Sequence, residues 1–237
     1  MNNDETREHA IYSPSRLAHI AACPWWTGGV SGDYAQRGSD IGADIAAAAI
    51  AGTPLEQEAS GWGLVAVQQI MDERPQMVWS AEDLTDTQIP DVWGYPDIVG
   101  RDGFGSSVLI ELKTGYGRRP TPIENQQIRA YVLGLFRQDR ALECVDAYLV
   151  EVDQHLVTAE TFTRDDVPGL HGDIVRLIDF ASRAGRQDLR PGPHCAYCAL
   201  RERCEALEES ASRSLAIPPD VLPDRGDYGM GQTPSTA

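Results

Sequence analysis

The sequence predicts a single α/β domain in which helices flank a central mixed sheet and the two ends of the chain are joined. Three observations support this fold class. The chain has 237 residues with 42% apolar content, which fits one elaborated domain better than two independent ones. Segments with strand-like alternation lie between segments with helical periodicity. Four of the five cysteines lie towards the two ends of this pattern, at spacings that suit one shared site.

Helix-start and turn signals define the helical segments. Ser13 is a suitable N-cap and Pro14 occupies the first helical position, while Cys23 and the proline after it end the first helix. A Pro-Gly pair at 168–169 is expected to weaken the last helix. The predicted helices cover residues 14–22, 38–51, 55–72, 122–136 and 164–183.

Alternation of apolar and polar residues, bounded by turn residues, defines the strands. The Arg-Asp-Gly sequence at 101–103 is typical of a turn between two antiparallel strands. The first three strands are therefore predicted to form an antiparallel meander. The predicted strands cover residues 76–82, 92–99, 108–113 and 144–152.

The two ends of the chain differ in composition from its middle. We expect residues 1–12 to be a flexible N-terminus, and residues 13–207 to form the folded domain, with 191–207 carrying the late cysteines. The remaining residues are acidic and then rich in Pro, Gly, Ser and Thr, and cannot bury enough apolar surface to offset chain entropy. We therefore expect residues 208–237 to be an acidic and polar tail that is disordered beyond about Ser214.

The chain is strongly acidic, with 36 acidic and 20 basic residues and a formal net charge of −16. This charge argues against a broad phosphate-binding surface. It is compatible with an enzyme that holds divalent cations, because such a site needs carboxylates and the cations then supply local positive charge. No stretch approaches the roughly 20 apolar residues of a membrane helix, and the first residues are too polar for a signal peptide. We expect a soluble, cytoplasmic protein without membrane association.

The most informative segment is the predicted strand 108–113, which reads Val-Leu-Ile-Glu-Leu-Lys. Alternation places Glu111 and Lys113 on the face opposite to the apolar side chains at 108, 110 and 112. Charges in such a setting must be compensated, since an unpaired buried charge costs several kcal/mol. Asp97 ends the preceding strand, and a hairpin brings it back near Glu111. Two carboxylates and a lysine suit a Mg²⁺ or Mn²⁺ ion that activates water and stabilises charge on a phosphate.

Four further polar residues follow this strand. Gln127 and Tyr131 lie four apart on the predicted helix, so they share one face, from which both can donate hydrogen bonds to a phosphate or a base. Arg118 and Arg119 lie between the strand and that helix. They are candidate contacts to the DNA phosphate backbone at the site entrance, and the alternative interpretation is a solvated loop.

In this order and spacing, the motifs at Asp97, at 111–115 (Glu-Leu-Lys-Thr-Gly) and at Gln127 with Tyr131 resemble the RecB-type branch of the PD-(D/E)XK nuclease superfamily. The resemblance implies a restriction-endonuclease-like core and phosphodiester hydrolysis in DNA. It assigns Asp97, Glu111 and the backbone carbonyl of Leu112 to the metal, Lys113 to catalysis, and Gln127 and Tyr131 to the additional motif of the branch. Exonuclease action on single-stranded ends is what the resembling families imply.

The sequence departs from this family at its first motif. The family usually carries a histidine on the early helix, and here the segment 37–42 ends in Gly42. Asp40, Asp44 or Glu82 could replace the missing ligand, and Glu82 is favoured because its predicted strand lies beside the site. Weak metal binding with slow or absent cleavage is the other interpretation.

The cysteine spacing predicts a second metal centre. Cys195, Cys198 and Cys204 lie near the C-terminus and Cys23 follows the first helix, so four thiolates can converge and tie the termini together. The pattern resembles the iron-sulfur nucleases related to AddB and the CRISPR-associated nucleases of spacer acquisition, which implies a structural four-iron, four-sulfur cluster. A zinc site, with Cys23 or His194 as fourth ligand, is the alternative.

Two other functions are compatible with the sequence. The first is a DNA-binding protein that keeps the fold and the cluster but lost metal competence with the histidine. The second is a zinc-stabilised interaction module in which Glu111 and Lys113 are a structural ion pair. The resemblance suggests a phage or mobile-element setting and leaves open a recombination or helicase partner.

Overall fold

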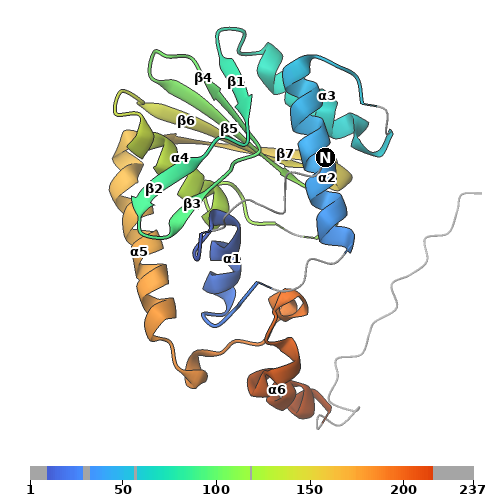
Figure 1. Ribbon diagram of the computed structural model, residues 1–237, viewed down its shortest axis with the longest axis vertical. Coiled ribbons are helices and arrows are strands. Elements are labelled where there is room, and N and C mark those ends of the chain that lie inside the picture. Colours follow the sequence, from blue (N-terminus) through green and yellow to red (C-terminus); the bar gives the residue numbers. More distant parts are fainter. Residues whose placement is uncertain (1–9, 29–32, 56–57, 118, 216–237) are drawn as a thin grey trace, which may run out of the picture.

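The computed structural model describes residues 10–28, 33–55, 58–117 and 119–215, and shows a sheet with helices on both faces (Figure 1). The helices are α1 Pro14–Ala22, α2 Asp33–Ala51, α3 Glu58–Asp72, α4 Gln126–Gln138, α5 Val167–Arg183 and α6 Glu205–Leu215. The strands are β1 Val78–Ala81, β2 Thr85–Ile89, β3 Val92–Gly94, β4 Ile98–Arg101, β5 Ser106–Lys113, β6 Cys144–Glu151 and β7 Leu156–Thr163. No helix within these ranges is both long enough and apolar enough to cross a membrane.

The five-stranded sheet has the order β1-β4-β5-β6-β7 and is mixed. Strand β4 pairs antiparallel with β1 and β5, and β7 pairs antiparallel with β6. Strands β5 and β6 are parallel, because α4 carries the chain back along the sheet between them. The predicted mixed sheet and its antiparallel meander are therefore confirmed.

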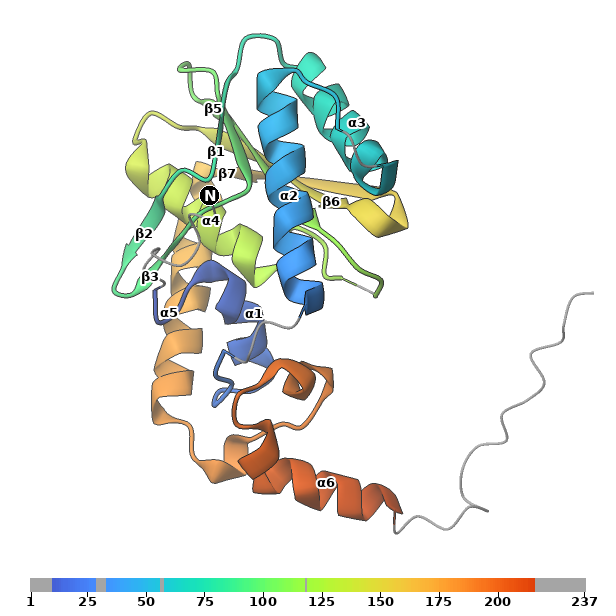
Figure 2. The ribbon, with the colours of Figure 1, turned by 45° about the vertical axis from the view of Figure 1, so that its right-hand side comes forward.

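Two apolar layers hold the helices against the sheet. Leu109 of β5 packs in one cluster with Ile128 of α4, together with residues of α1 and α5. Its neighbours Val108 and Ile110 pack in the other cluster with Ile45 of α2 and residues of α3. Figures 1 and 2 show α2 and α3 on one side of the sheet and α4 and α5 on the other. Since side chains alternate along β5, Glu111 and Lys113 project towards the α4 side.

The predicted strand 92–99 is two strands in the structure. The chain leaves the sheet at 95–97, since Pro96 cannot donate a ladder hydrogen bond. Strand β3 pairs instead with β2 in a separate two-stranded sheet. The sequence did not predict β2, because its residues are mostly polar. Thr87 is buried there with its hydroxyl donating to the Val92 carbonyl at 2.7 Å.

Other element bounds also differ from the predictions. Strand β7 was missed, because it is a mostly exposed edge strand with polar side chains. Helix α5 begins at Val167, after a 3-10 turn at Arg164–Asp166. Pro168 therefore lies in the first turn, where backbone N–H groups have no partner within the helix, so a proline costs no hydrogen bond there. The predicted weakening of this helix is wrong. Helix α2 begins at Asp33 and α4 at Gln126, so the bounds 38–51 and 122–136 shift as well.

The two ends of the described chain lie against each other. The Trp26 indole donates to the His194 carbonyl at 3.2 Å, and the Ala199 N–H donates to the Thr27 carbonyl at 3.2 Å. Gly28 and Cys198 form an antiparallel bridge. Figure 2 shows the C-terminal segment below α1, as these contacts require. The backbone thus joins the segments that carry the early and late cysteines.

The expected terminal segments are partly ordered. Ala10 is buried, and the Tyr12 N–H donates to the Asp91 carbonyl at 3.0 Å, although residues 1–12 were expected to be flexible. Helix α6 occupies the start of the range 208–237 and ends close to Ser214, beyond which the sequence predicted disorder. Residues 1–9 and 216–237 lie outside the described residues.

Candidate active site

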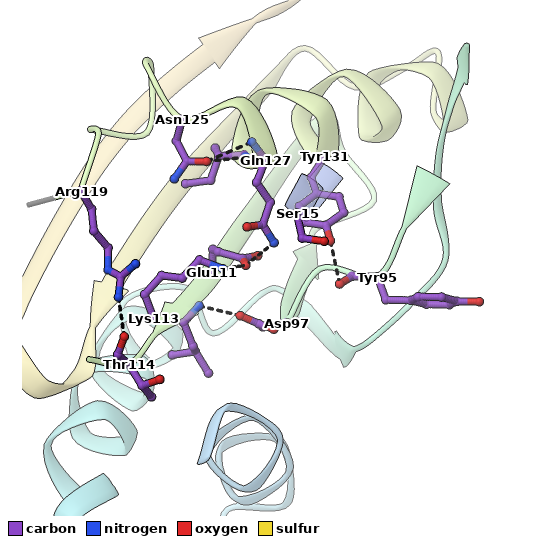
Figure 3. A network of polar contacts seen from close by, with 12 residues as sticks. Ser15, Tyr95, Asp97, Glu111, Lys113, Thr114, Arg119, Asn125, Gln127 and Tyr131 are labelled. Carbon is purple, nitrogen blue, oxygen red and sulfur yellow. Dashed lines mark hydrogen bonds and ion pairs between the residues drawn. The ribbon is translucent and has the colours of Figure 1, made fainter. Parts of the chain in front are cut away.

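Asp97 lies between β3 and β4, in the segment 95–97 where the chain leaves the sheet, and it is held against β5. Its carboxylate accepts a hydrogen bond of 2.6 Å from the Leu112 N–H (Figure 3). Because Leu112 lies between Glu111 and Lys113 in the sequence, this one bond brings the aspartate beside both. The structure therefore brings together the two carboxylates and the lysine that the sequence predicted.

Glu111 lies at the centre of the site and is only 2% exposed. One carboxylate oxygen, Oε1, accepts from Lys113 Nζ at 2.6 Å and from Gln127 Nε2 at 2.5 Å (Figure 3). The other oxygen, Oε2, is buried and has no hydrogen-bond partner. A buried carboxylate oxygen with an unused lone pair is costly unless a cation occupies the space in front of it.

Lys113 is the only lysine in the sequence, whereas arginine supplies the other 19 basic residues. Its side chain is 27% exposed, so it reaches both the buried glutamate and the solvent side of the site. Burial alone would lower the pKa of Lys113, but the charges of Glu111 and Asp97 outweigh burial and raise this pKa above its ordinary value. The amine is therefore a cation at neutral pH.

Helix α4 begins at a point that directs Gln127 towards Glu111. The Asn125 side chain caps the helix by accepting from the Gln127 N–H at 3.0 Å and the Ile128 N–H at 3.3 Å. This cap was missed by the sequence analysis, although an asparagine before a helix is a usual start signal. It locks the first turn, so the Gln127 amide points at the carboxylate.

Tyr131 holds the turn before Asp97. Its hydroxyl donates to the Tyr95 carbonyl at 3.0 Å, and its side chain is buried. Gly94 allows this contact, because a Cβ there would lie 2.9 Å from Pro14 Cδ and 3.2 Å from the Tyr131 hydroxyl. Burial, with the charge of Glu111 second, raises the pKa of Tyr131, so the hydroxyl keeps its proton and donates. In the structure this residue positions the aspartate turn.

Asp97 is surrounded by features that disfavour its charged form. Burial, followed by the nearby charge of Glu111, raises its pKa to about 8, against the lowering effects of Lys113 and the Leu112 N–H. Two carboxylates held this close to each other repel when both are ionised. A divalent cation between them would remove that repulsion, so the oxygen-rich donor set fits Mg²⁺ or Mn²⁺.

Glu82 is the best placed of the three candidate replacements for the missing histidine. Its N–H donates to the Pro96 and Asp97 carbonyls at 3.2 and 3.3 Å, and its charge contributes to the raised pKa of Asp97. Asp40 and Asp44 are exposed on α2. Across the described ranges, no three His, Cys, Asp or Glu side chains are grouped to hold a metal ion. An ion here would complete its shell with backbone oxygen, water or substrate.

Gly42 leaves space at the position of the missing histidine. The residue is buried in α2, yet a Cβ built on it would meet nothing within 4 Å. One turn earlier, a Cβ on Gly38 would lie 2.5 Å from the Thr114 hydroxyl oxygen, so this face of α2 lies against the end of β5. A side chain at position 42, where the family usually has a histidine, would therefore meet no close neighbour at its Cβ.

The loop between β5 and α4 is held by residues that the sequence analysis did not identify. Glu151 ends β6, lies opposite Lys113 in the parallel register and is 4% exposed. Its carboxylate accepts from Gln154 and forms an ion pair with Arg119 Nε at 3.5 Å. The Arg119 guanidinium also donates to the Thr114 carbonyl. Arg119 is thus engaged within the fold, its contact to a phosphate stays a prediction, and Arg118 lies outside the described residues.

The cysteines lie in the segments that the backbone joins. Cys23 is buried at the end of α1, and Cys195, Cys198 and Cys204 are half-buried. All are free thiols in the structure, and the same described ranges hold no preformed cysteine ligand group. Cys144 begins β6, where its thiol contacts the Ser106 hydroxyl at 3.4 Å.

Comparisons with known proteins were made for the whole chain. A sequence model of the PD-(D/E)XK nuclease superfamily matches residues 35–205. A solved structure titled "Crystal structure of SSO0001" is similar with a TM-score of 0.42 and 15% identity, covering 86% of this chain and 90% of that chain. No curated protein matches the sequence. The superfamily model spans every residue from Asp97 to Tyr131 that the structure gathers around Glu111, and this chain therefore belongs to the PD-(D/E)XK nuclease superfamily.

Proposed function

We propose that the protein is a Mg²⁺- or Mn²⁺-dependent DNA exonuclease that acts on single-stranded ends. The observation that carries the proposal is the buried Glu111 Oε2, which has no partner while Oε1 receives both Lys113 and Gln127. This leaves the second carboxylate oxygen of Glu111 without a protein donor, as a ligand for a cation. The preference for single-stranded ends rests on the resemblance to the RecB-type branch.

The residues of the site have separate tasks in this proposal. Asp97 and Glu111, with the Leu112 carbonyl and Glu82, hold the ion, which when bound lowers the pKa of water and stabilises charge on a phosphate. Lys113 is a cation with a raised pKa, so it donates to the attacking water or to the phosphate. Gln127 keeps Glu111 in place. Tyr131 acts through the Tyr95 turn and is a positioning residue.

Cleavage of end-labelled single-stranded DNA by anaerobically purified protein tests this function. We expect Mn²⁺-dependent release of short products from one end and none after chelation of the metal. Labels at the two ends then give the polarity, and a circular single strand separates exonuclease from endonuclease action. If the protein binds DNA but cuts nothing with Mg²⁺ or Mn²⁺, the proposal is wrong and a non-catalytic DNA-binding protein replaces it.

The affinity for Mn²⁺ is expected to rise with pH. Asp97 carries a proton below its pKa of about 8, and metal binding must displace that proton. The apparent affinity should therefore increase about tenfold per unit of pH up to about pH 8 and then level off. Calorimetric titration between about pH 6 and 9 measures this. Asp97→Asn is the matched control, because an amide has no proton to release. A wild-type affinity that does not change with pH would contradict the assignment.

The proposal includes a four-iron, four-sulfur cluster on Cys23, Cys195, Cys198 and Cys204. The backbone contacts between residues 26–28 and 194–199 support it, since they place the early and late cysteine segments side by side. Anaerobically purified protein should be brown, absorb at about 400 nm and contain about four iron atoms per chain. Cys198→Ser should lose the iron, whereas Cys144→Ser should keep it. A colourless protein that contains one zinc ion per chain would contradict the iron-sulfur cluster and support the zinc site.

A further inference from the structure

Tyr116 presents an aromatic ring to solvent immediately after the strand that carries Lys113. Its side chain is 84% exposed. It stands between Gly115, with a φ of +82°, and Gly117, with a φ of +144°. Both glycines adopt backbone angles that residues with a Cβ rarely adopt, so the shape of this turn depends on them. The turn directs the ring away from the core of the protein.

The turn is held in place on both sides of the ring. The Gly115 N–H donates to the Asp153 carboxylate, and the Gln154 side chain donates to the Gly117 carbonyl at 3.0 Å. Arg119 ties the start of the same loop by donating to the Thr114 carbonyl. The backbone on either side of Tyr116 is thus fixed by the turn after β6. An exposed ring on a fixed backbone loses little conformational entropy when it binds a partner.

The ring lies close in sequence to the lysine of the site. Tyr116 is three residues beyond Lys113, at the open end of the site. Phe104, which is also strongly exposed at 92%, precedes β5. The two therefore lie at opposite ends of an eight-residue strand, roughly 25 Å apart. Of the two, Tyr116 is the ring that follows the Lys113 end of β5.

The charge of the protein favours a DNA contact that does not depend on cations. A net charge of −16 provides little attraction for a phosphate backbone, and the Arg119 guanidinium is engaged with Glu151 and Thr114. Base stacking on an aromatic ring needs no cation and is tolerant of sequence. It requires an unpaired base, because both faces of a base inside a duplex are already covered by its neighbours.

We propose that Tyr116 is a base-stacking residue that binds an unpaired base of single-stranded DNA beside the active site. The inference rests on the proposed nuclease function and deepens it, since it names the feature that distinguishes single strands from duplexes. It predicts a contact to a base, whereas Lys113 and an ion held by the carboxylates would face the phosphate.

Fluorescence anisotropy with a short labelled single strand, without added Mg²⁺ or Mn²⁺, tests the proposal on the full chain. Tyr116→Ala should weaken binding by about 5- to 150-fold, the range for loss of one stacked base. The loss should persist when the salt concentration is raised. Tyr116→Phe should bind like wild type, because it keeps the ring. Phe104→Ala is the matched control for removal of an exposed ring, and it should have no effect.

An abasic-site scan locates the contact. Single strands that lack one base at successive positions should bind wild type weakly at one position, and Tyr116→Ala should lose that dependence. The proposal is wrong if Tyr116→Ala binds intact single strands as tightly as wild type does. It is also wrong if the variant loses as much affinity for duplex DNA as for single strands, or if wild type binds no single strand. Because binding is measured without cleavage, an inactive protein with an intact Tyr116 effect would refute the nuclease proposal alone.

Discussion

Replacing Lys113 by alanine is expected to reduce Mn²⁺-dependent cleavage of single-stranded DNA by roughly 10²- to 10⁴-fold. The amine is the only cation that donates to Glu111, at 2.6 Å, among the interactions that the described residues show. Its raised pKa keeps it charged where negative charge develops on the phosphate. Single-turnover rates at saturating DNA measure this loss, because they separate chemistry from binding.

Lys113→Arg is the sharpest companion variant. Arginine keeps the positive charge but replaces a compact ammonium by a wide, planar group. The chain uses arginine at each of its other 19 basic positions, so arginine is well tolerated elsewhere. We expect the arginine variant to bind DNA normally and to cleave nearly as poorly as the alanine variant. Wild-type cleavage by Lys113→Ala would remove the lysine from the mechanism and return Glu111 and Lys113 to a structural ion pair.

Replacing Glu151 by alanine is expected to lower the free energy of unfolding by about 3 kcal/mol. The carboxylate is 4% exposed, accepts from Gln154 and forms an ion pair with Arg119, so its removal leaves a partly buried guanidinium without its counter-charge. The value lies at the low end of the range for broken buried ion pairs, because the Arg119 side chain keeps 29% exposure to water. Urea unfolding gives the free energy from the midpoint and slope.

The control for this variant is Glu73→Ala. Glu73 also pairs with an arginine, Arg74, but its side chain is 73% exposed. Exposed pairs contribute about 0–1 kcal/mol, so this change should hardly move the urea midpoint. Because the Glu151 pair holds the loop after Lys113, the Glu151 variant should also cleave more slowly at temperatures where it is folded. Equal stability of both variants would show that the buried pair does not hold the loop.

The central part of the site could be predicted from the sequence because it lies on one strand. Alternation alone places Glu111 and Lys113 on one face of β5, and a hairpin returns Asp97 to them. The Gln127 contact followed from a helix that begins shortly after the strand. These relations involve neighbours in sequence or one turn, which local patterns encode.

Contacts that depend on register could not be predicted in the same way. Glu151 meets Arg119 only because β6 runs parallel to β5 with Lys113 opposite Glu151, and no local pattern sets that register. The break at Pro96 was also missed, since an apolar run on both sides of it resembled one strand. Strands β2 and β7 were missed because their residues are mostly polar. Tertiary contacts bury part of β2, and β7 lies at the edge of the sheet.

The use of a single lysine makes the site visible to spectroscopy. Protein grown on ¹⁵N-labelled lysine would carry one labelled ammonium group, and its resonance would belong to Lys113 without any assignment. The raised pKa predicts that this signal persists in the protonated form beyond the ordinary titration range of a lysine. Addition of Mn²⁺ would broaden it through the electron spin of the ion, and addition of Mg²⁺ would shift it. Each step of metal and DNA binding can thus be followed at one nitrogen atom in the intact protein.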